Sequence, residues 1–271
     1  MTININSVDS QTINIERRNK ILKIIADAKP DILCLQELSI KRYPEFRQGL
    51  DSIFGSNSLE LESIDKLHYY IYSRIPYLNF KKYNNLGIID KTGFDEENYH
   101  ELDRYNNDHM PIYSADLILP DNRQITIMSC HLRSSAYTTA RRSMSDGDYW
   151  LKGIPLYINN YKIGKRIRDA QALFLRQQID SIKSTNRYVF VAGDLNDFNR
   201  STCLETIQGN DLFDAWWKGG NGFGFTYVGW NLRLRLDHIL YPKDFELCNV
   251  YIVDSDVSDH RALIADFKLN K

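Results

Sequence analysis

The segment that decides the fold is Val189–Asn196, which reads Val-Phe-Val-Ala-Gly-Asp-Leu-Asn. A short apolar run followed by glycine is typical of a buried strand that ends in a turn. Asp194 and Asn196 stand two positions apart, so the two-residue period of a strand places both on one side of it. An acid in this position commonly caps a turn, and Gly193 commonly permits one. The segment therefore predicts a buried strand with two polar side chains at its carboxyl end.

Polar side chains end apolar runs at four other places. These are Glu37 after Ile32–Gln36, His131 after Ile125–Cys130, Asp237 within Leu236–Leu240, and Asp259 with His260 just before Ala262–Leu269. Each one alone is more often a solvated loop residue or a satisfied hydrogen-bonding group, but five in one chain are harder to dismiss. A desolvated carboxylate costs several kcal/mol unless a counter-charge neutralises it, and a divalent cation is the usual neutraliser. Oxygen ligands favour Mg²⁺, Mn²⁺ or Ca²⁺ over zinc.

The segments between these runs predict a mixed α/β domain built on sheets. Apolar residues at helical spacing predict helices over Ile13–Ala28 and Lys165–Lys183. Apolar runs of strand length predict strands at Ile32–Gln36, Lys66–Arg74, Ile112–Leu119, Ile125–Cys130, Tyr188–Ala192, Phe225–Val228, Leu234–Leu240 and Ala262–Leu269. His238 should point away from Asp237 to the opposite face of its strand, so we interpret it as a structural residue.

Composition bounds the function only loosely. The 271 residues carry a formal net charge of −1, which excludes a histone-like basic protein but not a local cationic patch. No apolar run approaches the length of a membrane span, and residues 1–7 do not resemble a secretory signal. The four cysteines have no metal-ligand spacing, so we expect reduced thiols and, with no signal peptide, favour a cytoplasmic location.

A basic stretch from Arg133 to Arg168 follows His131 directly. Its arginines include Arg133, Arg141, Arg142 and Arg168, and tyrosines and Trp150 are interleaved with the cations. Such a stretch could reach over the edge of a site to a polyanionic substrate, with the aromatic rings as base-stacking platforms. A solvated protein surface is an equally good interpretation.

The ordered set of motifs resembles the endonuclease/exonuclease/phosphatase superfamily, which includes deoxyribonuclease I and exonuclease III-like nucleases, sphingomyelinases and inositol-polyphosphate phosphatases. The matching blocks are Asn4–Ser7, Leu35–Glu37, Ser129–Leu132, Gly193–Asn196, Arg235–His238 and Ser258–His260. The resemblance runs from residue 4 to about residue 268. It implies a four-layer α/β/β/α sandwich of two packed mixed sheets with outer helices. It also implies a single domain over residues 1–271, because Asn4 and His260 must share one site.

The resemblance further implies a divalent metal site. Glu37 would be the principal ligand of Mg²⁺ or Mn²⁺, with Ca²⁺ also compatible, assisted by Asn4 and Asn6. Asp259 would support these ligands or bind a second ion.

The catalytic residues implied by the resemblance come from the other blocks. Asp194 would orient or deprotonate the attacking water, and Asn196 would hold the water or the phosphate. His260 would contact a non-bridging oxygen while Asp237 fixes its ring. His131 would donate to the phosphate or protonate the leaving group, and its presence is closer to the deoxyribonuclease, sphingomyelinase and phosphatase branches than to the exonuclease III-like one.

The expected activity is hydrolysis of a phosphodiester by an activated water, with nucleic acid as the favoured substrate. An inositol-phosphate phosphatase or a sphingomyelinase-like enzyme is the alternative within the class. A catalytically inactive binding domain is the alternative from another class, and retention of the acidic residues argues against it.

Overall fold

The apolar runs of the sequence form the strands of two sheets in the computed structural model, which describes residues 1–6, 14–38, 44–55, 70–83, 112–134, 154–229 and 233–270. The first sheet has five strands in the order β10-β11-β1-β2-β3. Their bounds are β1 Thr2–Asn4, β2 Ile32–Gln36, β3 Tyr70–Ser73, β10 Phe245–Ile252 and β11 Leu263–Leu269. The sheet is mixed, because β1 and β2 run parallel whereas β1 pairs antiparallel with β11.

The second sheet has six strands in the order β4-β5-β6-β7-β9-β8. Their bounds are β4 Tyr77–Tyr83, β5 Ile112–Ile118, β6 Gln124–His131, β7 Tyr188–Asp194, β8 Leu212–Asp214 and β9 Asp237–Pro242. The central strands β6 and β7 are parallel, and the other pairs are antiparallel.

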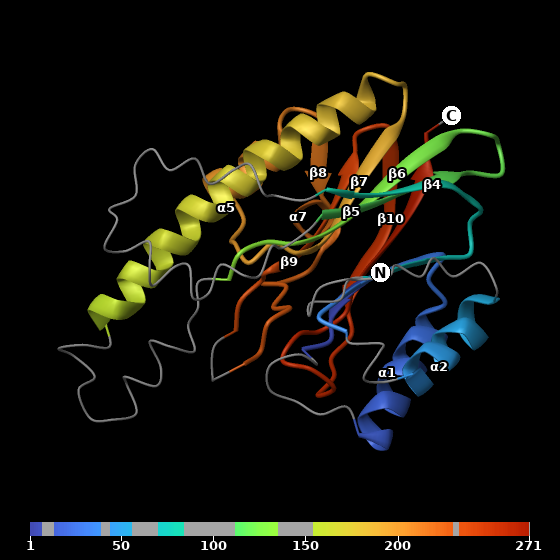
Figure 1. Cartoon of the computed structure of the whole chain (residues 1–271), viewed down its shortest axis with the longest axis horizontal. Coiled ribbons are helices and arrows are strands. Elements are labelled where there is room, and N and C mark those ends of the chain that lie inside the picture. Colours follow the sequence, from blue (N-terminus) through green and yellow to red (C-terminus); the bar gives the residue numbers. More distant parts are fainter. Residues whose placement is uncertain are drawn as a thin grey trace.

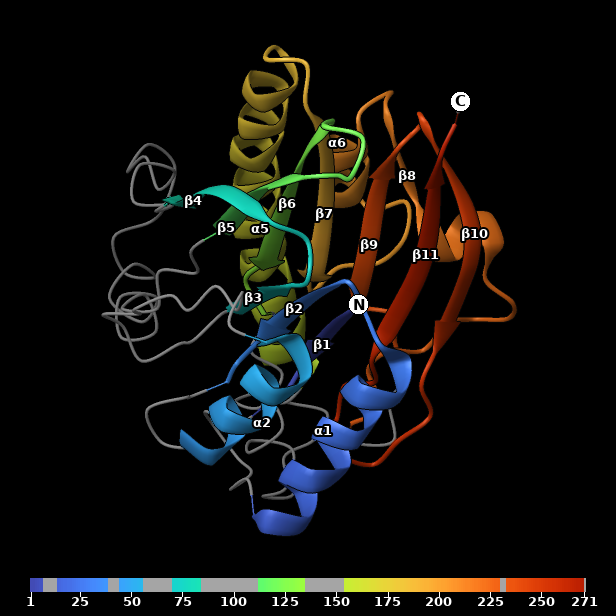
Figure 2. The same cartoon turned by 90° about the vertical axis from the view of Figure 1, so that its right-hand side faces the viewer.

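Helices cover the outer face of each sheet, as Figures 1 and 2 show. Helices α1 (Ile15–Ala28) and α2 (Pro44–Phe54) lie beside the first sheet, whereas α5 (Ile154–Lys183) and α6 (Thr202–Gln208) lie beside the second. The short helix α7 (Ala215–Gly219) follows β8 directly. The expected four-layer α/β/β/α sandwich of two mixed sheets is therefore confirmed.

The alternation of side chains along the strands divides the core into three layers. Leu33 and Leu35 of β2 pack outward with Ile21 and Ile25 of α1. Cys34, between them, faces the other sheet and joins the core that separates the two sheets. On the far side of the second sheet, the cluster comprises Met128, Cys130, Val189, Val191, Ala172, Leu175 and Ile179, among others.

Several boundaries differ from the sequence-based expectations. Helix α1 begins at Ile15 because the Asn14 side chain accepts a hydrogen bond from the Arg17 backbone N–H. Helix α5 already begins at Ile154, ahead of the expected start at Lys165. The strand expected at Phe225–Val228 is wrong, because Tyr227 makes only isolated bridges to Leu234 and His260.

Two further expectations concern the chain as a whole. All four cysteines are free, and only Cys248 is exposed. Among the described residues, no helix has the length and apolarity to cross a bilayer, the 30-residue α5 included.

Candidate active site

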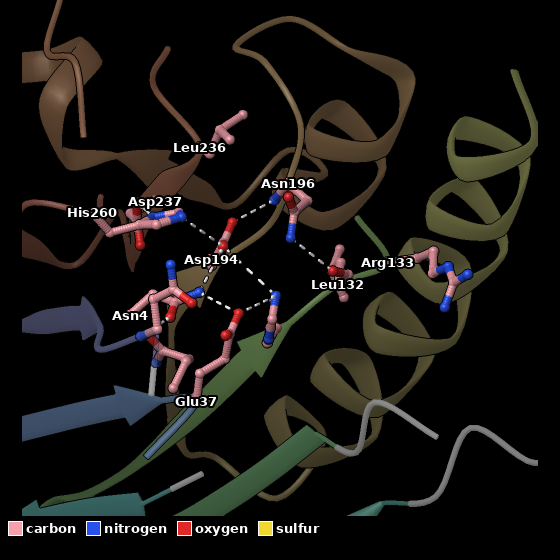
Figure 3. A network of polar contacts seen from close by, with 12 residues as sticks. Asn4, Glu37, Leu132, Arg133, Asp194, Asn196, Leu236, Asp237 and His260 are labelled. Atoms are coloured by element: carbon pink, nitrogen blue, oxygen red, sulfur yellow. Dashed lines mark hydrogen bonds and ion pairs between the residues drawn. The ribbon is translucent and has the colours of Figure 1, made fainter. Parts of the chain in front are cut away.

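Strand register brings the polar chain positions together at one edge of the sandwich. His131 of β6 pairs with Asp194 of β7, and Asp194 pairs in turn with Asp237 of β9. In the first sheet, Asn4 of β1 pairs with Gln36 of β2, so Glu37 follows immediately. The two sheets thus present their site residues at facing strand ends, and Figure 3 shows the side chains of Asn4, Glu37 and Asp194 turned toward one another.

The Asn4 side chain connects the two sheets at the centre of the site. Its Nδ2 donates to Glu37 Oε1 at 2.9 Å and to Asp194 Oδ2 at 3.1 Å. The other Asp194 oxygen, Oδ1, accepts a hydrogen bond from the Asn196 backbone N–H at 2.9 Å. Two carboxylates from different sheets are therefore held around one amide.

Two imidazoles face the Asp194 carboxylate. Nε2 of His131 lies 3.6 Å from Asp194 Oδ2 and 3.7 Å from Glu37 Oε1. Nε2 of His260 lies 3.6 Å from the same Asp194 oxygen. The other ring nitrogen of His260, Nδ1, is 2.7 Å from Asp237 Oδ2, and both residues are buried. This contact fixes the ring of His260 and leaves Nε2 directed at the centre of the site.

Burial and charged neighbours have opposing effects on the pKa values of these groups. Desolvation raises the pKa of Glu37 and that of Asp194, although nearby imidazoles oppose the change. Burial alone would lower the pKa of His260, but the carboxylates of Asp237 and Asp194 outweigh it and raise the pKa to about 10. For Asp237, burial opposes ionisation, yet the charge and hydrogen bond of His260 lower its pKa. His260 is thus held as an imidazolium across the neutral pH range.

The backbone of the site adopts conformations that are uncommon for residues with side chains. Glu37, Asn196 and Asn6 have φ values of 55°, 50° and 48°. Gly193 has φ 146°, and a Cβ atom there would stand 1.8 Å from the carbonyl oxygen of Cys130. Backbone strain of this kind concentrates at functional sites, where the surrounding packing must hold it in place.

The Ser258–His260 turn connects the last strand to the same region. Asn6 Nδ2 donates to Asp259 Oδ1 at 2.8 Å, and Ser258 Oγ donates to the carbonyl oxygen of Asn4 at 2.9 Å. The backbone N–H of His260 donates to Ser258 Oγ at 3.1 Å. The structure therefore brings together all nine residues predicted for catalysis and metal binding.

The donor set suits a hard divalent cation. Four carboxylates (Glu37, Asp194, Asp237 and Asp259) face two imidazoles, so acidic groups outnumber basic ones in the cluster. Oxygen atoms of Glu37 and Asn4, with Asn6 and Asp259 beside them, are the donors that Mg²⁺ and Mn²⁺ prefer. Ligand atoms of Asp194, Asp237 and His260 also lie within 4.8 Å of one another. In that group, His260 Nδ1 is already hydrogen-bonded to Asp237, so Glu37 is the better candidate ligand.

Of the four predicted substrate-binding arginines, the two that the structure describes do not join this cluster. Arg141 and Arg142 lie outside the described residues. The Arg133 side chain points away from Asp194 toward α5 in Figure 3. Arg168 is fully buried and its Nε donates to Asp197 Oδ2 at 3.1 Å, so the prediction that it binds substrate is wrong. Arg168 lies on the face of α5 that is turned toward the sheet, so it is buried although its charge predicts exposure to solvent.

Sequence reasoning missed the residues that hold the site in place. Thr226 Oγ1 accepts hydrogen bonds from the backbone N–H groups of Leu236 and Asp237, both at 3.0 Å. The Tyr227 ring packs edge-on against His260 with centroids 5.1 Å apart. Both residues lie in the segment expected to be a strand, whose apolar pattern gave no sign of this role. His238 behaves as expected, with Nδ1 2.7 Å from Asp214 Oδ2 and its ring directed away from the site.

Comparison with known proteins agrees with this fold. The chain resembles D. rerio TDP2 complexed with a single-strand DNA product (18% identity, TM-score 0.65, 98% of each chain covered). It also resembles the human Nocturnin catalytic domain (17%, TM-score 0.67, 99% of this chain and 94% of that one). A third similar structure is the Bacteroides thetaiotaomicron mannosyl-6-phosphatase Bt3783 (12%, TM-score 0.67, 99% of each chain). A search of curated proteins finds no match.

The family model named Endonuclease/Exonuclease/phosphatase matches residues 1–260, which is nearly the whole chain. The three activities in that name all hydrolyse phosphoric esters. The site described above supplies the carboxylates and imidazoles that such hydrolysis requires. The chain belongs to the Endonuclease/Exonuclease/phosphatase family and is an enzyme that acts on phosphoric esters.

Proposed function

We propose that this protein is a divalent-metal-dependent phosphodiesterase that cleaves its substrate by in-line attack of water. The observation that carries the proposal is the position of Asp194. Its Oδ2 lies 3.6 Å from the Nε2 atoms of both His131 and His260, and it shares the Asn4 amide with Glu37. A potential base, two imidazoles and a carboxylate suited to metal binding therefore surround one small volume.

Asp194 is the residue we assign to the attacking water. Two hydrogen-bond donors, Asn4 Nδ2 and the backbone N–H of Asn196, direct its oxygens, and the imidazole Nε2 atoms of His131 and His260 lie 3.6 Å from Oδ2. Burial raises the pKa of Asp194 and makes it a stronger base than an exposed aspartate. The Asn196 side chain is tied to the carbonyl oxygen of Leu132 at 3.0 Å, which leaves its amide oxygen for the water or the phosphate.

We assign to His260 and His131 the stabilisation of the negative charge that develops on the phosphate. The raised pKa of His260 keeps the ring protonated, so Nε2 can donate to a non-bridging oxygen throughout the reaction. Asp237 orients that ring through Nδ1. His131 Nε2 lies between Glu37 and Asp194, from where it can donate to the phosphate or to the leaving oxygen.

We assign the metal to Glu37 and Asn4, with Asn6 and Asp259 supporting them or holding a second ion. When bound, Mg²⁺ or Mn²⁺ supplies Lewis-acid stabilisation of the phosphoryl oxygens and of the leaving alkoxide. The chain's own part is to hold the carboxylates of Glu37 and Asp259 in place through hydrogen bonds from the Asn4 and Asn6 side chains.

Nucleic acid is the substrate class we favour. Phe223 is 81% exposed and stacks on Phe225 with centroids 5.3 Å apart. Phe225 lies two residues before Tyr227, which contacts His260, and Phe198 is partly exposed two residues after Asn196. Exposed aromatic rings beside a phosphate site suit stacking of nucleobases. The likeness to D. rerio TDP2, solved with a single-strand DNA product, points the same way.

A substrate panel tests the proposal. The purified protein is assayed with Mg²⁺, Mn²⁺ or Ca²⁺ on single-stranded and duplex DNA, RNA, DNA with 5′-tyrosyl ends, inositol phosphates, a sugar 6-phosphate and sphingomyelin. We expect metal-dependent hydrolysis of a nucleic-acid diester, abolished by chelator. Preferred hydrolysis of a phosphomonoester would replace the diester assignment with the phosphatase alternative. Binding without hydrolysis of any ester would favour a binding domain.

A further inference from the structure

We propose that the buried Arg168 is a positioning residue that sets the spacing between the β6 and β7 ends of the active site. This inference rests on the proposed function, because it assigns a role in that reaction. Arg168 lies on α5 and does not belong to the carboxylate and imidazole cluster. It acts on the two segments that immediately follow His131 and Asn196.

The guanidinium of Arg168 joins both segments at once. Its Nε donates to Asp197 Oδ2 at 3.1 Å, and its Nη1 donates to the carbonyl oxygen of Arg133 at 2.9 Å. Gln171, one turn further along α5, accepts a hydrogen bond from the backbone N–H of Arg133 at 2.9 Å. Helix α5 therefore forms hydrogen bonds to the segment directly after β6 through Arg168 and Gln171, and to the segment after β7 through Arg168.

These contacts lie one or two residues from the reacting groups. Arg133 is two residues after His131, and Asp197 follows Asn196. The Asn196 side chain donates to the carbonyl oxygen of Leu132 at 3.0 Å, so the two segments are also linked directly. A change in the distance between them moves His131 relative to Asp194 and Asn196.

The same anchor extends to the third strand of the site. The carbonyl oxygen of Asp197 lies 3.0 Å from His238 Nε2, and His238 Nδ1 lies 2.7 Å from Asp214 Oδ2. Because His238 follows Asp237 on β9, Asp197 connects Arg168 to the strand that orients His260. The contacts of Arg168 thus reach the ends of β6, β7 and β9.

Stability alone does not account for this arrangement. Arg168 and Asp197 are fully buried, and burying an ion pair costs about as much desolvation energy as the pair returns. The planar fork of arginine can bind a carboxylate and a carbonyl in a fixed relative geometry, which neither lysine nor an apolar residue can do. Precise spacing of two strand ends is the benefit that this geometry provides.

Arg176, two turns further along the same helix, provides a matched control. Its Nη1 donates to Asp211 Oδ1 at 2.9 Å and to the carbonyl oxygen of Ile207 at 3.0 Å. It therefore also ties α5 to the neighbouring chain through a carboxylate and a carbonyl. Its partners lie at α6 and the loop before β8, and none of them belongs to the site.

The experiment compares Arg168→Met, Arg168→Lys and Arg176→Met in melting temperature, kcat, KM and the metal concentration for half-maximal activity. A misplacement of about 1 Å lowers turnover roughly 100-fold. We expect kcat to fall about 10- to 100-fold in both Arg168 variants, with KM and the metal response within about 3-fold, because the metal ligands belong to the other sheet. Asp197→Asn, an isosteric change, should reproduce the kcat loss if Arg168→Met does not fold. Arg176→Met should lose stability but keep kcat.

A second readout does not need activity. The imidazole C–H signals of His131 in NMR spectra should move in the Arg168 variants and stay in place in Arg176→Met. Unchanged kcat and unchanged His131 signals in folded Arg168→Lys and Asp197→Asn would overturn the inference. Equal losses of kcat in the Arg168 and Arg176 variants would reduce Arg168 to a stability role. Failure of the wild-type protein to hydrolyse any ester would refute the proposed function, and the NMR comparison would still decide the inference.

Discussion

Substitution of Asp194 should lower the rate of catalysis without changing the fold. Asp194→Asn keeps the side-chain shape and can still accept the Asn196 backbone N–H at Oδ1, but it cannot take a proton from water. We expect an unchanged fold by circular dichroism and a kcat lower by about 10²- to 10⁴-fold. Asp211→Asn, in an ion pair distant from the site, serves as the control and should retain turnover. Turnover of Asp194→Asn within a few fold of the wild-type rate would remove Asp194 from the mechanism.

Asp214 predicts a pH dependence of stability. Burial alone would raise the pKa of Asp214, but the hydrogen bonds and charges of His238 and Arg235 outweigh it and lower the pKa far below its ordinary value. A carboxyl with a lowered folded-state pKa stabilises the protein fully above its unfolded pKa, near 4, and loses that contribution as the pH falls further. Asp214→Asn should therefore cost about 3 kcal/mol at neutral pH, since it leaves the buried Arg235 without its counter-ion.

Urea unfolding at several pH values measures this effect. The difference in unfolding free energy between wild type and Asp214→Asn should be constant from pH 7 to pH 5. Below pH 4 it should shrink by about 1.4 kcal/mol per pH unit. A difference that stays constant down to pH 3 would show that Asp214 is not held ionised by its partners.

At the residue scale, the sequence predicts which side chains meet but not what holds them. Asp194, His131 and Asp237 are visible as polar ends of apolar runs because a strand has a strict two-residue period. Arg168 was misassigned because its charge suggests solvent, and only tertiary packing shows that Asp197 lies opposite it. Thr226 supports Asp237 from a segment without regular structure, which no periodic pattern can locate.

The sequence predicts a helix or strand correctly where one face of the element is buried and the other is not. The expected Lys165–Lys183 helix is correct in its interior, because Ala172, Leu175 and Ile179 form one buried stripe. Its actual start at Ile154 lies before the expected start and was not predicted. Strand β10 was missed because it is an edge strand whose burial does not alternate regularly. Boundaries are set by capping and packing rather than by periodicity.

Gly193 makes a prediction about the contact between β6 and β7. A Cβ atom at this position would stand 1.8 Å from the Cys130 carbonyl oxygen, a backbone atom that cannot move without breaking the strand pair. We expect Gly193→Ala to destabilise the fold by about 3 kcal/mol or more and to reduce kcat in whatever fraction folds. Denaturant unfolding and activity per folded molecule measure the two effects.

Gly55→Ala is the control for backbone strain alone. Gly55 also has a positive φ, 76°, but among the described residues no atom outside its chain neighbours lies within 4 Å of its Cβ position. Its substitution should cost roughly 1–2 kcal/mol and leave kcat unchanged. Equal losses of unfolding free energy at the two glycines would mean that β6 and β7 separate easily. That would contradict the direct pairing of Cys130 with Gly193.

The whole molecule brings proposed metal ligands of the first sheet against proposed catalytic groups of the second. Asn4 and Glu37 belong to the first sheet, whereas Asp194, Asp237 and His131 belong to the second. The order of motifs in the sequence predicts this convergence through family resemblance. Local pattern alone could not, because the hydrogen bond between Asn4 and Asp194 spans 190 positions of chain. An ion bound at this junction should therefore strengthen contact between the two sheets.

Thermal unfolding with and without metal tests this consequence. A ligand at 100 times its dissociation constant stabilises the folded state by about 2.7 kcal/mol, which corresponds to a rise in Tm of about 5 °C or more. We expect millimolar Mg²⁺ or Mn²⁺ to produce such a rise in the wild-type protein and none in Glu37→Gln. The Asp211→Asn variant, whose carboxylate lies away from the site, should respond as the wild type does.

Glu37→Gln should also change the stability of the metal-free protein. Whereas the substitution removes the stabilisation by metal, it should raise the stability of the protein without metal. Burial and the nearby Asp194 charge raise the pKa of Glu37, so the ionised side chain destabilises the fold at neutral pH when no cation is bound. Because the folded-state pKa lies above the unfolded one, this penalty grows as the pH rises between the two values. In chelator at pH 8, Glu37→Gln should therefore melt at a higher temperature than wild type, and Mg²⁺ should reverse the order. A lower Tm for Glu37→Gln in chelator would mean that Glu37 is a structural partner of Asn4 rather than a charge kept in place for a metal.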